Sequence, residues 1–237
     1  MVLAHGLGAN GLDNFLTLAP ALANAGYCVY STTYGQTILG PLVAGLGPMD
    51  ESAQTLSTFI DTVRNRTGAA KVDIVGHSEG TTVPAYYMKF LGGDKVVNRY
   101  VGFGANYQGT TLSGLGTLAK ALHFQPVLNG VGCQACSQFL LGSDFLQKLN
   151  AGGVSVPGPQ YVNIVSRYDK IVTPYTSGIM APAANVTNVV LQDACGADYA
   201  GHLGMAIDPN IANLAKYYLD PEHAAKPGCT FFPGFGI

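Results

Sequence analysis

The chain has 237 residues, 48% of them hydrophobic, so it fits one large domain with a substantial core and is not a disordered chain. Its formal net charge is −2 and it has no basic stretch, which excludes the electrostatic footprint of a nucleic-acid-binding protein. No apolar run reaches the roughly 18 residues of a membrane span.

Charged residues make up only 11% of the chain, against roughly 25% in ordinary soluble domains. A surface so poor in charge indicates exposed apolar side chains or an extracellular setting. Met1–Ala4 is already strand-like and runs directly into a glycine-rich segment, so we expect no signal peptide within this chain. An export signal was either removed or never present.

The strand at Met1–Ala4 is followed by the glycine-rich segment His5–Gly11. A strand that ends in His-Gly-x-Gly places backbone N–H groups at the carboxyl edge of a parallel sheet, where an oxyanion donor is needed. We assign one such donor to the N–H of Leu7, the alternative being a plain glycine turn. His5 is expected to orient this loop through hydrogen bonds and not to act in the chemistry.

Apolar residues recur at helical spacing over Leu12–Ala25, which predicts a helix whose buried face includes Leu16 and which ends at Gly26. Tyr27–Thr32 is predicted to be the next strand, with Cys28 as a buried free thiol.

Residues 34–48 form a Gly/Pro-rich loop that carries several apolar side chains, among them Ile38 and Leu42. Loops at this edge of a sheet often line a ligand site, so we interpret this one as a wall for an acyl chain and not a mere connector. Met49–Thr67 is predicted to be an amphipathic helix that Gly68 caps.

The run Val72–Gly80 carries the strongest signal in the chain. Strand-forming residues lead into Gly-His-Ser-Glu-Gly, and a helix-compatible segment follows, which is the context of a nucleophile elbow. A Cβ at Gly76 or Gly80 would collide with the neighbouring strand or helix. Ser78 is then the nucleophile and the N–H of Glu79 the second oxyanion donor. The alternative is a glycine turn with a surface serine.

Further strands and helices alternate along the rest of the chain, which predicts an α/β fold with a mostly parallel sheet. The expected elements are a helix at Thr82–Phe90, strands at Arg99–Phe103, Gln160–Ser166 and Val186–Leu191, and a helix at Asn210–Leu219. Pro84 is expected in the first turn of its helix. The long insertion at 112–150 is interpreted as a cap or lid within a single domain, 1–237.

Asp169 and His202 each follow a predicted strand, so they share an edge of the sheet with Ser78. The order Ser, Asp, His is that of α/β-hydrolases and differs from the orders in the two common protease folds. We therefore interpret His202 as the general base and Asp169 as the acid, with Asp193 second. A histidine base must be neutral, so activity is expected to rise through roughly pH 6–7.

The five cysteines bear on the compartment. Cys133 and Cys136 form a Cys-x-x-Cys pair, which is open to interpretation as a zinc half-site or a redox dithiol. A second ligand pair is not apparent, and the pair lies among glycines. We favour two disulfides, Cys133–Cys136 and Cys195–Cys229, which indicate an oxidising compartment.

Several segments together resemble the secreted bacterial triacylglycerol lipases of the lipase class 2 type. They are His-Gly-Leu-Gly-Ala-Asn-Gly-Leu-Asp-Asn-Phe, Lys-Val-Asp-Ile-Val-Gly-His-Ser-Glu-Gly, Lys-Phe-Leu-Gly-Gly, Ser-Arg-Tyr-Asp-Lys-Ile-Val-Thr-Pro-Tyr and Gly-His-Leu-Gly-Met. The resemblance implies an α/β-hydrolase fold, export and hydrolysis of carboxylic esters. It places Ser78 on the nucleophile, Asp169 on the acid, His202 on the base, and Leu7 and Glu79 on the oxyanion donors.

Glu79 departs from the family, which more often has Gln or Met at this place. A carboxylate beside the elbow would oppose the negative charge of the transition state and would raise the pKa of His202. On that interpretation, Glu79→Gln moves the acidic limb of the pH–rate profile to lower pH.

The same triad also serves soluble-ester esterases, polyester depolymerases and acyltransferases, and the sequence separates these poorly. A non-catalytic binding protein on a hydrolase fold is the alternative from another class, and the intact Ser–Asp–His set argues against it. The proposed chemistry needs no cofactor and no metal. The expected partner is a lipid or ester substrate at an interface, and the oligomeric state stays open.

Overall fold

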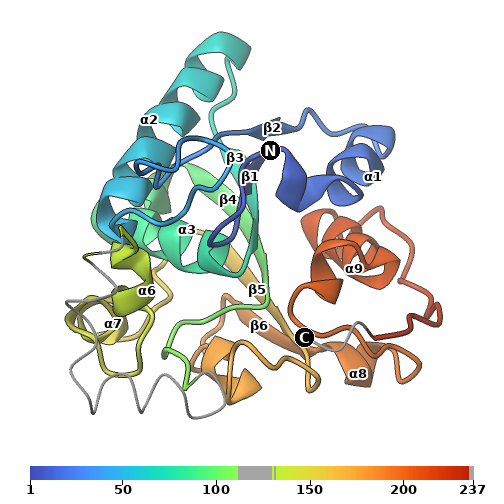
Figure 1. Cartoon of the computed structure of the whole chain (residues 1–237). Coiled ribbons are helices and arrows are strands. Elements are labelled where there is room, and N and C mark those ends of the chain that lie inside the picture. The colour runs from blue at the N-terminus through green and yellow to red at the C-terminus, as the bar shows by residue number, and fades with distance from the viewer. Residues whose placement is uncertain (112–129, 131, 235–237) are drawn as a thin grey trace.

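The computed structural model describes residues 1–111, 130 and 132–234, and its centre is a six-stranded sheet (Figure 1). The strand order is β2-β1-β3-β4-β5-β6, and every neighbouring pair is parallel, as the sequence predicted. The strands are β1 (Val2–Ala4), β2 (Tyr30–Ser31), β3 (Val72–His77), β4 (Val97–Phe103), β5 (Gln160–Val165) and β6 (Val186–Val190).

Helices cover both faces of this sheet (Figure 1). On one face lie α2 (Met49–Thr67) and α3 (Glu79–Phe90), and on the other lie α1 (Leu18–Asn24) and α9 (Pro209–Leu219). Each pair of helices encloses its own cluster of buried apolar side chains against the sheet. The shorter helices are η1 (Asp13–Phe15), η2 (Gly93–Lys95), α6 (Gln134–Gln138), α7 (Asp144–Asn150), η3 (Tyr175–Gly178), α8 (Leu191–Ala194) and η4 (Gly204–Ala206).

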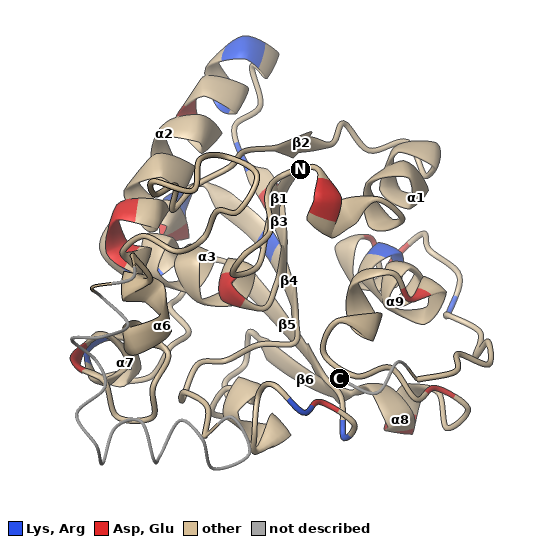
Figure 2. Ribbon diagram, in the orientation of Figure 1, with Lys and Arg blue, Asp and Glu red and all other residues tan. Residues whose placement is uncertain are grey.

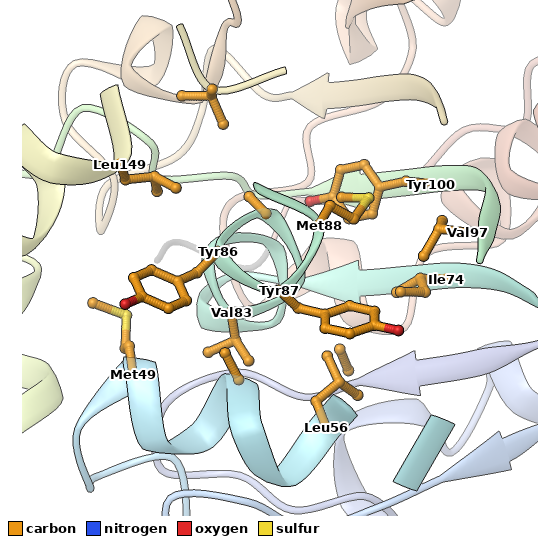
Figure 3. Close-up of a cluster of buried hydrophobic side chains, with 14 of the residues drawn as sticks. Met49, Leu56, Ile74, Val83, Tyr86, Tyr87, Met88, Val97, Tyr100 and Leu149 are labelled. Atoms are coloured by element: carbon orange, nitrogen blue, oxygen red, sulfur yellow. The ribbon is translucent and has the colours of Figure 1, made fainter. Parts of the chain in front are cut away.

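Helix α2 forms over the residues that its amphipathic pattern predicted. Leu56 and Ile60 are fully buried, while Glu51 and Arg66 face solvent. The helix ends at Gly68, which has a φ of 71° and donates its N–H to the carbonyl of Arg64 at 2.8 Å. Figure 3 shows Leu56 of α2 facing Val83 and Tyr87 of α3, in the cluster that seats α3 on the sheet. This packing fixes the start of α3, where Ser78 lies.

The predicted helix at Leu12–Ala25 is divided in two, because η1 and α1 are separate elements. The side chain of Asn14 in η1 is buried and bonded to other segments, which holds this turn apart from α1. Leu16, expected in the buried face, lies between the two helices and is 70% exposed. That prediction is wrong because the helical register breaks there.

Two other local predictions are also wrong. The second strand is only Tyr30–Ser31, so Cys28 precedes it and is exposed instead of buried. Helix α3 begins at Glu79, so Pro84 lies beyond the first turn and has no N–H to donate to the carbonyl of Gly80. The helix tolerates this because its packing, and not the complete ladder of backbone bonds, holds it in place.

The insertion predicted at 112–150 is described in part. Residues 112–129 and 131 lie outside the described residues, whereas α6 and α7 pack against α2 and α3. Phe145 of α7 stacks on Tyr86 of α3 at a ring distance of 5.3 Å. Lys89 donates to the carbonyls of Leu149 and Ala151 at 2.7 Å each, which anchors the end of α7.

Two disulfides are present, Cys133–Cys136 and Cys195–Cys229. The second joins the segment that precedes His202 to the C-terminal segment, across 34 residues of sequence. Within the described part of the chain, none of the helices has the length and apolar character needed to cross a membrane.

Candidate active site

Ser78 lies in the sharp turn between β3 and α3. Its φ of 56° and ψ of −119° make it the one residue other than glycine with a positive φ among the described residues. A Cβ built on Gly76 would overlap the carbonyl oxygen of Gly80, and one built on Gly80 would overlap that of Ala4. The turn therefore forms only with glycines at both places, as the sequence predicted, and it presents the Ser78 hydroxyl at the carboxyl edge of the sheet.

The structure brings together Ser78, His202 and Asp169, which lie far apart in the sequence. His202 Nε2 is 2.8 Å from Ser78 Oγ, and His202 Nδ1 is 2.7 Å from Asp169 Oδ2. The side chains of His202 and Asp169 are 3% and 2% exposed, so the hydrogen bond between them is shielded from water. Such a chain of bonds can take the serine proton onto the imidazole while the carboxylate fixes the tautomer.

Asp169 is held by the turn that follows β5. Its Oδ1 accepts from the N–H groups of Ile171 and Val172 at 2.9 and 2.7 Å, which leaves Oδ2 for His202. The second candidate for the acid, Asp193, lies at the surface in a bidentate pair with Arg167 at 2.8 and 2.9 Å. The structure therefore does not bring Asp193 to His202.

The other histidines are placed elsewhere. His5 is buried behind the loop that follows β1, where it stacks on Tyr34 at 4.1 Å and hydrogen-bonds to Gly6 and to the N–H of Tyr34. Burial lowers the pKa of His5, so it is a neutral group that orients the loop, as expected. His223 is exposed and pairs with Asp220, and His123 lies outside the described residues.

The two predicted oxyanion donors flank Ser78. The N–H groups of Leu7 and Glu79 make no hydrogen bond to any other described residue. Leu7 follows Gly6, which lies close to the nucleophile: a Cβ built on Gly6 would be 3.1 Å from the Cβ of Ser78. Glu79 is the first residue of α3, so its N–H lies at the positive end of the helix dipole. Both groups are thus available to an oxygen bound beside Ser78.

The side chain of Glu79 is fully buried, and neither carboxyl oxygen has a hydrogen-bond partner among the described residues. It lies against Gly45, where an added Cβ would come within 2.7 Å of Oε2 and 3.0 Å of the Gly6 carbonyl. This desolvation raises the pKa of Glu79 well above its ordinary value. Burial therefore favours the neutral acid, which argues against the expectation of a charged carboxylate beside the elbow.

A cavity of about 390 Å³ opens beside Ser78. Its walls come from the loop after β1, the elbow, the turn after Asp169 and the segment around His202, and the apolar ones are Leu7, Ala9, Ile171, Leu203 and Ala206. A carbonyl carbon placed next to Ser78 Oγ would thus have an apolar surface for the group attached to it.

Sequence reasoning missed two residues that border this site. Asn14 was treated as part of a helix, and His77 only as a loop residue of the elbow. In the structure Asn14 binds the N–H of Gly6 at 2.6 Å and contacts His77, which in turn contacts the backbone of His202. A single sequence holds no signal for these bonds, since the partners lie 8, 63 and 125 residues apart.

Comparison with known proteins gives a family match and a set of similar folds. A family model described as Lipase (class 2) matches residues 1–206. Lipase B of Aspergillus fumigatus has a TM-score of 0.70 at 19% identity, over 90% of this chain and 50% of that chain. The mature form of lipase BlEst2 of Bacillus licheniformis has a TM-score of 0.66 at 16% identity, over 93% and 89%.

A thermophilic esterase from Thermogutta terrifontis is also similar, with a TM-score of 0.58 and 14% identity over 94% of this chain and 89% of that chain. At these identities the likeness shows the fold, which is the α/β-hydrolase fold. This chain spans about half the length of the Aspergillus lipase and of the propeptide form of BlEst2.

Proposed function

Because the chain belongs to the class 2 lipase family, we propose that it hydrolyses carboxylic esters, and triacylglycerols in particular. Ser78 is the nucleophile, His202 the general base and Asp169 the acid of the triad. One observation carries the proposal: an unbroken line of hydrogen bonds from Ser78 Oγ through His202 to Asp169, at 2.8 and 2.7 Å.

The reaction proceeds by acyl transfer to the serine. His202 Nε2 takes the proton of Ser78 as Oγ attacks the ester carbonyl, and the imidazolium that forms is stabilised by Asp169. The same proton then passes to the leaving alcohol. A water molecule, deprotonated by His202, attacks the acyl-enzyme; the bond between the acyl carbon and Ser78 Oγ breaks, the carboxylic acid is released, and His202 returns the proton to Ser78.

Negative charge develops on the carbonyl oxygen in both steps. The N–H groups of Leu7 and Glu79 are proposed to bind this oxygen, each stabilising the transition state by about 2.7–4 kcal/mol. A neutral Glu79 side chain is compatible with this role, since a buried negative charge next to the donor would oppose the oxyanion.

The activity is tested with a fluorophosphonate probe and a soluble ester such as p-nitrophenyl butyrate. We expect stoichiometric labelling and hydrolysis by the wild type, and loss of both in Ser78→Ala with an unchanged circular dichroism spectrum. A folded wild type that neither labels nor hydrolyses any ester would refute the proposal and would favour a binding protein on a hydrolase fold.

The preference for lipid rests on the surface around the cavity. Apolar side chains of the loops after β1, β2 and His202 are exposed there, and we call them the apolar rim: Leu12, Leu16, Ile38, Leu39, Leu42 and Leu203. Ile38, Leu12 and Leu42 are 97%, 78% and 76% exposed. The loop between β2 and α2 has no charged residue, as Figure 2 shows.

Hydrogen bonds place these loops next to one another. The side chain of Asn10 binds the carbonyl of Leu42, Gly8 N–H binds that of Ala44, and Thr17 binds that of Ala206. Exposed apolar side chains near a reactive serine are suited to contact with a lipid surface, because each large aliphatic side chain gains about 1.5–3 kcal/mol on leaving water. The exposed carboxylate of Asp13 also lines the cavity and stays at its polar side.

The substrate class is tested by comparing emulsified triolein with p-nitrophenyl butyrate. We expect Ile38→Ser/Leu42→Ser to lower the rate on the emulsion by about 10-fold or more while the rate on the soluble ester stays within twofold. Phe90→Ser, at the far end of α3 and also partly exposed, is the matched control. Equal losses on both substrates, or hydrolysis of the soluble ester alone, would favour an esterase.

An extracellular location is proposed on the disulfides and the low charge. Two disulfides fit an oxidising compartment, and they fit poorly with a reducing cytosol. Recovery of the activity from culture medium of the native host would support this, and its confinement to the cytosolic fraction would contradict it.

A further inference from the structure

A line of buried hydrogen bonds joins the loop after β1 to the backbone of His202, on the two sides of the active site. None of the three triad side chains takes part in it. Gly6 N–H donates to Asn14 Oδ1 at 2.6 Å, Asn14 Nδ2 lies 2.9 Å from His77 Nδ1, and His77 Nε2 lies 3.1 Å from the backbone carbonyl of His202. Asn14 and His77 are 7% and 4% exposed. Water therefore cannot replace these partners at low cost.

The chemistry of the groups fixes the direction of every bond in this line. The Gly6 N–H can only donate, so the oxygen of Asn14 faces it and the amide nitrogen faces His77. His77 Nδ1 must then accept, which leaves its single proton on Nε2, pointing at the carbonyl of His202. Burial, with a smaller contribution from His202, lowers the pKa of His77 to about 3, and this keeps the ring neutral.

Each end of this line carries an element of the proposed chemistry. Gly6 precedes Leu7, whose N–H is the proposed oxyanion donor of the first loop. The carbonyl at the other end belongs to His202 itself, the proposed base. Ser78 follows His77 directly, and the His77 ring is also held by stacking on Phe103 at 4.9 Å. One short set of bonds thus spans the nucleophile from the oxyanion loop to the base.

We propose that Asn14 and His77 are positioning residues of the ester hydrolase. Together they fix the distance between the oxyanion loop and the backbone of His202, which lie on opposite sides of Ser78. The inference rests on the proposed function of this site. Both residues border the cavity beside Ser78, and in this proposal they act through the oxyanion loop and His202 instead of taking part in the reaction themselves. A displacement of about 1 Å between the oxyanion donors and the base would cost roughly 100-fold in rate.

A role confined to folding makes a different prediction. Buried polar groups need partners in any core, so loss of Asn14 would then lower stability and leave the chemistry of the folded fraction intact. Asn163 offers the comparison, because it is fully buried, bonds to Tyr107 at 2.8 Å and Asn188 at 3.1 Å, and has no bond to the triad or the oxyanion loop.

The test compares Asn14→Ala, His77→Leu and His77→Gln with Asn163→Ala. We measure Tm, kcat and KM for p-nitrophenyl butyrate, and inhibition by a trifluoromethyl ketone, which forms an oxyanion on the serine. We expect kcat of Asn14→Ala and His77→Leu to fall about 100-fold with KM within threefold, and the affinity for the ketone to fall in parallel. His77→Gln keeps an acceptor and a donor, so we expect it to regain at least tenfold over His77→Leu.

Asn163→Ala is expected to lose Tm but to keep kcat within threefold of the wild type. The inference is overturned if folded Asn14→Ala and His77→Leu keep kcat within threefold, or if Asn163→Ala loses as much kcat as they do. It is also overturned if His77→Gln is no better than His77→Leu. An inactive wild type would instead refute the proposed function, so the two failures are distinguishable.

Discussion

Glu79→Gln tests whether the buried carboxyl next to the nucleophile is neutral. Glutamine has nearly the same volume and carries no charge, so the substitution removes the ionisable proton and little else. In the folded chain desolvation raises the pKa of Glu79, and both oxygens lack partners among the described residues. In the unfolded chain the group titrates near its ordinary value of 4.5.

The sign and size of the effect follow from linkage between protonation and folding. Between pH 4.5 and the raised pKa of the folded state, the unfolded chain releases a proton that the folded chain keeps. Each pH unit in this window therefore lowers the free energy of unfolding of the wild type by about 1.4 kcal/mol. The stability contributed by the neutral carboxyl is fully present below pH 4.5 and is lost as pH rises toward the folded pKa.

Urea unfolding at half-unit steps from pH 5 upward measures this difference. We expect the stability of Glu79→Gln relative to the wild type to increase by about 1.4 kcal/mol for each pH unit, and its kcat near pH 7 to stay within threefold. The acidic limb of the pH–rate profile should not move, contrary to the expectation from sequence. Parallel stability curves for the two proteins, or a shifted acidic limb, would show that Glu79 is ionised and refute the reasoning.

Three further outcomes are expected. Asp169→Asn should lower kcat about 10⁴-fold with little change in Tm, because an amide holds the imidazole in the wrong tautomer. Steady-state kinetics measures kcat and calorimetry measures Tm, and a fall in kcat of less than tenfold would contradict the role of Asp169. Gly76→Ala should destabilise the fold by at least about 1–3 kcal/mol, because the added Cβ would overlap the carbonyl of Gly80. Gly228 has open space around it, so Gly228→Ala should not destabilise the fold. Chemical denaturation measures both variants. Titration with Ellman's reagent should find one thiol, the exposed Cys28, in native and denatured protein alike, and five only after reduction; five before reduction would exclude the disulfides.

Local sequence patterns predicted many of the helices and strands and the turn that carries Ser78. The 3.6-residue periodicity of α2, the glycine after it and the order strand, turn, helix around Ser78 depend on neighbouring residues alone, and they have the predicted form apart from the earlier start of α3. The order of Ser78, Asp169 and His202 along alternating strands and helices was enough to bring them to one edge, since parallel strands all end there. Leu16 shows where local patterns fail. The helical pattern predicted it to be buried, but the bonds of Asn14 to distant residues interrupt the helix next to it.

The sequence by itself determined where the chain turns and which residues can meet, because covalent geometry and periodicity act over a few residues. Only the tertiary structure decided which of these groups are charged and what holds them. Burial raises the pKa of Glu79, which lies against Gly45, 34 residues before it, and Asn14 and His77 meet only because β1 and β3 pair. Desolvation and hydrogen bonding depend on such distant contacts, which no local pattern records.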